Sequence, residues 1–181
     1  MFQAIIVFLI VALSFQTVPV ALGLKSDFGS LRTLGFALLI PLTQVALFLA
    51  GIATGLRLMH LLADIRGIVL FAGFALIGVR MIIESFRVRK GERTYRLEQI
   101  QAVLLAASAQ AIYTFLAALL LASLVIDWRM MVLALSVSTL FMSGLGVSLK
   151  QGKTALSLCS FLFVLGGIYM LVCAVYLGLI Q

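Results

Sequence analysis

The sequence predicts an all-α integral membrane protein with six transmembrane helices arranged as two inverted three-helix repeats. Of its 181 residues, 64% are hydrophobic and only 10% are charged, whereas soluble domains are about half apolar and about a quarter charged. The apolar residues fall into six runs, each close to the length of about 20 residues that crosses a bilayer. Similar residues also recur at matching places in the two halves of the chain. Together these observations predict the fold class.

Charged and turn residues separate the six predicted spans. The spans cover residues 2–23, 34–56, 65–86, 99–125, 130–149 and 155–180. No basic residue precedes the first run, so we expect that span to be retained rather than cleaved as a signal peptide. A single transmembrane domain over residues 1–181 is therefore predicted. Repeat one covers about 2–86, a cytoplasmic loop about 87–98, and repeat two about 99–180.

The basic residues predict the orientation of these spans. The first, third and fifth connections hold nine of them: Lys25, Arg32, Arg87, Arg89, Lys90, Arg93, Arg96, Lys150 and Lys153. The second and fourth connections hold three: Arg57, Arg66 and Arg129. Because short cytoplasmic connections are enriched in Lys and Arg, both termini are predicted on the outer side. Most of the +7 net charge then reports topology, although the loop could also bind anionic lipid.

Each half of the chain repeats features of the other. The first and fourth spans carry Ser14-Phe15-Gln16 and, 94 residues later, Ser108-Ala109-Gln110. Seven residues separate a polar residue from a glycine in the second and fifth spans: Gln44 and Gly51, then Thr139 and Gly146. The third and sixth spans share a pattern at an offset of 89: Phe74, Leu76, Gly78 and Met81, then Phe163, Leu165, Gly167 and Met170. Since each half has three spans, the second half enters the membrane in the opposite sense, as in many secondary transporters.

Polar groups in hydrocarbon are costly unless they have partners, so the polar residues in the middle of the spans are the candidate substrate ligands. The predicted substrate-binding residues are Gln16, Gln44, Gln110, Thr139, Ser14 and Ser108. Pro19 is expected to free a backbone carbonyl near Phe15, and Pro41 to free one beside Gln44, because each removes a helix hydrogen bond. Neutral oxygens of this kind can ligate a hard cation. The alternative is that these groups form ordinary interhelical hydrogen bonds.

Other functional classes find little support in the sequence. It contains no Gly-rich phosphate loop, nucleophile elbow or Cys/His cluster, and His60 is its single histidine. An enzyme, a cofactor and nucleic-acid binding are therefore not expected, and the metal ligands stay unknown. Cys159 and Cys173 are expected as small apolar residues of one helix, where fourteen residues hold them roughly 21 Å apart.

Arg80 and Glu84 form the one charged pair inside a predicted span. Their spacing of four residues puts them on one helix face. They lie toward the cytoplasmic end of the third span, where long side chains reach water. The pair is therefore interpreted as an ion pair or gate at the inner mouth, with a transport site as the alternative.

The chain resembles the MntP-type manganese efflux pumps, a family of bacterial inner-membrane proteins grouped with the LysE-like exporters. The motif that carries the resemblance is Arg80-Met81-Ile82-Ile83-Glu84, followed by Phe86-Arg87. Leu31-Arg32-Thr33, and Met142-Ser143 with Gly146, support it. The resemblance covers nearly the whole chain and implies six spans, a bacterial inner-membrane location and export of divalent cations.

Three acidic positions of the family pattern differ in this chain. The resemblance places an aspartate in span one, another in span four and a glutamate in span two, and here these positions correspond to Gln16, Gln110 and Gln44. If the alignment of span four shifts by three residues, Tyr113 replaces the aspartate instead. A manganese ion would then meet a neutral site.

The expected function is an MntP-like transporter, ancestrally exporting divalent cations such as Mn2+ by alternating access of two inverted halves. Its expected partners are the lipid bilayer and Mn2+ or another small solute. One alternative is a degenerate homologue that serves as a structural or regulatory subunit, with a membrane protein partner or as a homo-oligomer. Another is an exporter of a neutral or zwitterionic solute.

Overall fold

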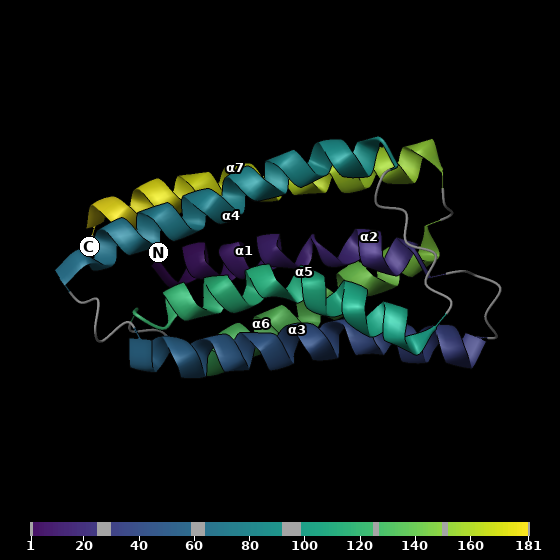
Figure 1. Cartoon of the computed structure of the whole chain (residues 1–181), viewed down its shortest axis with the longest axis horizontal. Helices are drawn as coiled ribbons and strands as arrows, with labels where there is room; N and C mark the ends of the chain where they lie inside the picture. Colours follow the sequence, from purple (N-terminus) through teal and green to yellow (C-terminus); the bar gives the residue numbers. More distant parts are fainter. Residues whose placement is uncertain are drawn as a thin grey trace.

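The computed structural model is a bundle of long helices (Figure 1). It describes residues 2–24, 30–58, 64–91, 99–124, 127–149 and 152–180, excluding the side chains of 30–32 and 180. The helices are α1 (Phe2–Ser14), α2 (Thr17–Leu22), α3 (Ser30–Leu58), α4 (Arg66–Arg89), α5 (Ile100–Leu121), α6 (Trp128–Ser148) and α7 (Lys153–Ile180).

The six predicted spans are confirmed. Six stretches are long and apolar enough to cross a membrane: Phe2–Leu22, Thr33–Leu58, Arg66–Arg89, Ile100–Leu121, Trp128–Ser148 and Lys153–Leu179. The chain is thus a multi-pass membrane protein, and its N and C termini lie at the same end of the bundle (Figure 1). The helix of the fourth span, α5, ends at Leu121, whereas the sequence predicted that this span would extend to residue 125. His60, Lys25, Arg93, Arg96 and Lys150 lie outside the described residues.

The first span is interrupted, so it consists of α1 and α2 rather than one helix. Pro19 has no N–H to donate to the carbonyl four residues earlier. The Phe15 carbonyl instead accepts from the Val18 N–H at 3.3 Å, and the Gln16 N–H donates to Leu13 at 3.4 Å. These bonds span three residues, as in a 3₁₀ turn. The carbonyl that we expected to be freed near Phe15 is therefore occupied, and the helix breaks at Gln16.

Helices pair across the two halves of the chain. The main pairs are α4 with α7, α3 with α5, and α2 with α6, and α3 also packs on α6. Figure 1 shows α4 and α7 lying side by side along most of their length. Exchanging the first span with the fourth, the second with the fifth and the third with the sixth reproduces this set of pairs. The pairing is consistent with the predicted inverted repeat.

Glycines set the closest helix approaches. A Cβ added to Gly78 would meet the Gly167 carbonyl at 2.8 Å, and one added to Gly167 would meet the Gly78 carbonyl at 2.8 Å. This reciprocal contact joins the two glycines that the repeat pairs at an offset of 89. Around it, the apolar partners of the same pattern are buried: Phe74, Met81, Phe163 and Met170.

Within the predicted repeat, a second pair of glycines suggests how the first and fourth spans correspond. Gly51 lies against the Phe115 carbonyl and the Ala118 methyl, whereas Gly146 lies against the Val18 carbonyl and the Ala21 methyl. Both glycines thus face a carbonyl and, three residues later, an alanine. Matching the two contacts relates Val18 to Phe115. In this register Gln16 corresponds to Tyr113, which is the shifted alignment that the sequence left open.

Candidate functional site

Gln16 lies at the break between α1 and α2 and is completely buried, with 0% of its surface exposed. Among the described residues, neither Oε1 nor Nε2 of its side chain has a hydrogen-bond partner. Burying an unpaired amide costs on the order of 1–3 kcal/mol. Such a group inside a membrane protein is a candidate ligand for a solute.

Gln44 lies in the middle of α3 and is also 0% exposed. Its Oε1 accepts a hydrogen bond from the Thr114 hydroxyl of α5, which joins the second span to the fourth. Its Nε2 has no partner among the described residues. Gln44 therefore keeps an unused hydrogen-bond donor in the interior.

The other predicted ligands offer fewer free polar atoms to a solute than Gln16 and Gln44. The hydroxyls of Ser14 and Thr139 donate to carbonyls of their own helices, Val11 at 2.6 Å and Leu135 at 2.6 Å respectively. Gln110 is buried one turn before Thr114 on α5. Ser108, by contrast, is exposed on the outer surface of α5, so its position separates it from the buried glutamines. The candidate site therefore centres on Gln16, Gln44 and Thr114.

Pro41 affects a different contact from the one expected. It leaves the Ala37 carbonyl without its helical donor, and the Ser143 hydroxyl of α6 donates to that carbonyl at 2.8 Å. The freed group lies about two turns from Gln44. It serves as a polar link between α3 and α6 rather than as part of the site.

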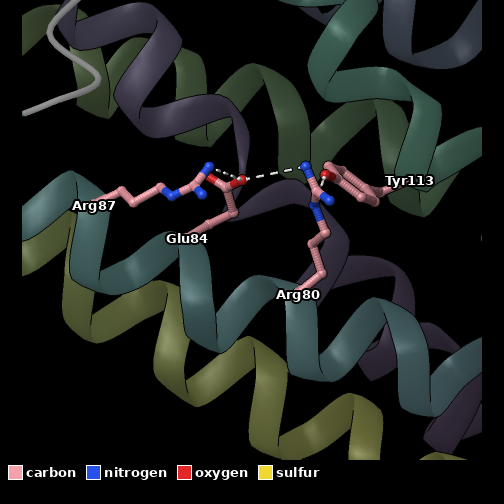
Figure 2. Close-up of polar contacts among 4 residues, drawn as sticks. All are labelled: Arg80, Glu84, Arg87 and Tyr113. Atoms are coloured by element: carbon pink, nitrogen blue, oxygen red, sulfur yellow. Dashed lines mark hydrogen bonds and ion pairs between the residues drawn. The ribbon is translucent and has the colours of Figure 1, made fainter.

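Four polar side chains form a cluster between α4 and α5 (Figure 2). Arg80 Nε donates to the Tyr113 hydroxyl at 2.7 Å. Glu84 Oε1 lies 3.7 Å from Arg80 Nη2 and 3.8 Å from Arg87 Nη1. The Glu84 side chain is 3% exposed, whereas those of Arg80 and Arg87 are 51% and 53% exposed. Arg80 thus pairs with Glu84 on its own helix and also bonds to Tyr113 on α5, in the second half of the chain.

Contacts place this cluster at the level of the break in the first span. Gly166 of α7 lies against the Met81 side chain, the Ala12 carbonyl and the Phe15 ring. Met81 follows Arg80 on α4, and Phe15 precedes Gln16. On the other side, Tyr113 precedes Thr114, which bonds Gln44. Arg80 is thus next in sequence to a residue packed near the break in the first span, and Tyr113 is next to the residue that bonds Gln44.

The described residues hold no group of three or more His, Cys, Asp or Glu side chains that could bind a metal ion. The site instead offers amides, hydroxyls and one guanidinium. Sequence reasoning selected Gln16 and Gln44 because of their depth in the spans. It missed the role of Tyr113, although the shifted alignment already pointed to that residue.

A family model described as "Putative manganese efflux pump" (MntP) matches residues 28–177. The matched region includes Gln44, Tyr113 and the whole cluster of Figure 2, and begins after the first span. No curated protein and no solved structure matches the chain. Because the family match covers well over half of the sequence, the chain belongs to the MntP family, described as putative manganese efflux pumps.

Proposed function

We propose that the chain is a membrane exporter that works by alternating access of its two inverted halves around Gln16, Gln44 and Thr114. The observation that carries the proposal is the interrupted first span, with a fully buried glutamine at the break whose amide has no partner among the described residues. Discontinuous helices near the midplane are a recurring device for solute sites in transporters. Membership of an efflux family supports the same conclusion.

Manganese is the substrate that the family supports, and we propose that this site contacts the ion without carboxylates. Stripping a dication of water in a low-dielectric interior is very costly unless negative groups replace the water. An amide oxygen such as Gln16 Oε1 can instead accept hydrogen bonds from the water ligands of a partly hydrated ion. Passage of Mn2+ with some of its water is therefore the form of transport that this neutral site suits best.

A neutral or zwitterionic solute is the second candidate. The observation that favours it is the unused Nε2 donor of Gln44, because an N–H group recognises an acceptor on a solute and repels a bare cation. A buried donor of this kind discriminates strongly against ligands that lack its partner.

Manganese tolerance tests the proposal. A bacterial strain without its own manganese exporter should regain growth in millimolar Mn2+ when it expresses this chain. Gln16→Ala and Gln44→Ala should abolish the rescue, since each removes a central contact. Gln101→Ala is the matched control, because Gln101 is an exposed glutamine in the first turn of α5.

The outcomes separate the alternatives. Rescue that survives the combined Gln16→Ala and Gln44→Ala changes would contradict the proposed site. Absence of rescue by the natural chain, with rescue by Gln16→Asp combined with Gln44→Glu, would favour a protein that no longer exports manganese. Stable co-purification of another membrane protein would then support the structural or regulatory subunit.

A further inference from the structure

We propose that Arg80 is a resident cation of the central site and sets its selectivity by lowering the affinity for divalent cations. The inference rests on the proposed function, because it takes Gln16 and Gln44 as the solute site. It adds a residue that neither the family match nor the proposed function assigns to solute selection.

The Arg80 guanidinium contacts α5, which belongs to the second half of the chain. Arg80 extends from α4 in repeat one, and its Nε donates to the Tyr113 hydroxyl of α5 in repeat two at 2.7 Å. Its guanidinium carbon also lies 5.9 Å from the centre of the Tyr113 ring, within the range of a cation–π contact. Figure 2 shows the two side chains converging from opposite helices.

The position that receives the guanidinium is equivalent to Gln16. Contacts of Gly51 with Phe115 and of Gly146 with Val18 relate residue 113 to residue 16. The residue after Tyr113 bonds to Gln44. One half of the site thus presents an amide without a described partner, while the equivalent place in the other half binds the positive charge of Arg80.

The surrounding charge does not neutralise this cation completely. Glu84 lies near both Arg80 and Arg87, at 3.7 Å and 3.8 Å, so these three side chains carry one more positive charge than negative. Gln16, Gln44 and Thr114 are uncharged. Because two arginines share the Glu84 carboxylate, it offsets only part of the Arg80 charge, and an incoming dication meets net repulsion from this cluster.

Arg87 provides a matched comparison. It is as exposed as Arg80, 53% against 51%, and lies at nearly the same distance from Glu84. Arg87 lies about two turns further along α4 than Arg80. No hydrogen bond is described between Arg87 and α5. If total charge were all that mattered, replacing either arginine would have the same effect. If position matters, only Arg80 should control cation affinity.

The test measures Mn2+ binding to purified protein by the electron paramagnetic resonance signal of unbound Mn2+. Gln16→Asp combined with Gln44→Glu supplies carboxylates, so binding is measurable whether or not the natural chain exports manganese. Into this background we place Arg80→Gln or Arg87→Gln. Removing a nearby like charge should increase Mn2+ affinity about tenfold or more for Arg80→Gln, and about twofold or less for Arg87→Gln.

A third variant separates the bond from the charge. Tyr113→Phe keeps Arg80 but removes the hydroxyl that accepts its hydrogen bond. The affinity for Mn2+ should therefore increase by a smaller factor than in Arg80→Gln. It also becomes the deciding variant if Arg80→Gln does not yield monodisperse protein.

Equal affinities of the Arg80→Gln and Arg87→Gln proteins would overturn the inference, as would absence of Mn2+ binding by the acidic background with and without Arg80. Failure of the natural chain to confer manganese tolerance would contradict manganese export alone. A selective effect of Arg80 on binding would stand in that case.

Discussion

The α4–α7 interface is tightly packed and apolar, whereas the centre of the bundle contains buried polar groups. Between α4 and α7, Gly78 and Gly167 bring two backbones together, and buried apolar residues such as Phe74 and Met170 fill the remaining space. In the centre, Gln16 and Gln44 are equally buried but keep polar atoms without described partners. Tight packing is what membrane helices use to associate. Under the proposed function, one region holds the protein together while the other leaves polar groups available to a solute.

The largest expected effect comes from filling the glycine contact. Gly78→Val places side-chain atoms against the Gly167 carbonyl, where an added Cβ already lies only 2.8 Å away. Because the nearest atom is a backbone oxygen that cannot rotate away, the helices must separate, and we expect a loss of about 3 kcal/mol or failure to fold. Thermal unfolding in detergent, followed by the fluorescence of Trp128, measures the change.

Gly144→Val is the control for this substitution. Gly144 lies on α6 with nothing within 4 Å of an added Cβ, so its replacement should leave the midpoint of thermal unfolding nearly unchanged. An equal loss of stability in both variants would show that helix propensity rather than close packing decides the result.

The second prediction concerns the centre and has the opposite sign. Gln16→Leu removes a buried amide without described partners and keeps a similar volume, so the protein should become more stable by about 1–2 kcal/mol. Solute transport should be lost at the same time, because stability and activity often conflict at functional sites. Reversible unfolding in mixed detergent micelles measures the gain.

Thr139→Val serves as the comparison for that gain. The Thr139 hydroxyl already donates to the Leu135 carbonyl at 2.6 Å, so replacing it should not stabilise the protein. A destabilised Gln16→Leu variant would show that the amide of Gln16 makes a structural bond, and the contrast between the two regions would fail.

The two regions also differ in how well sequence predicts them. Span lengths follow directly from hydrophobic runs, and the match between Gly78 and Gly167 was visible because the third and sixth spans share four residues. The correspondence of the first and fourth spans was harder, because apolar sequences offer chance matches such as Ser14 with Ser108. That match fails since Ser108 is exposed, and only the packing of Gly51 and Gly146 relates Gln16 to Tyr113. Depth in the membrane can be predicted from sequence, whereas the direction of a side chain depends on helix rotation.

The smallest predicted effect concerns a third place, the link from Ser143 of α6 to the Ala37 carbonyl of α3. This hydroxyl donates at 2.8 Å to a carbonyl that Pro41 deprives of its helical donor. Ser143→Ala should cost about 0.6–1 kcal/mol, the usual range for an interhelical hydrogen bond in a membrane. Pro41→Ala returns an N–H to that carbonyl, so the loss caused by Ser143→Ala should shrink in the double variant. A double-mutant cycle in mixed micelles measures the coupling. Additive changes would mean that Ser143 does not compensate for the helix hydrogen bond that Pro41 removes.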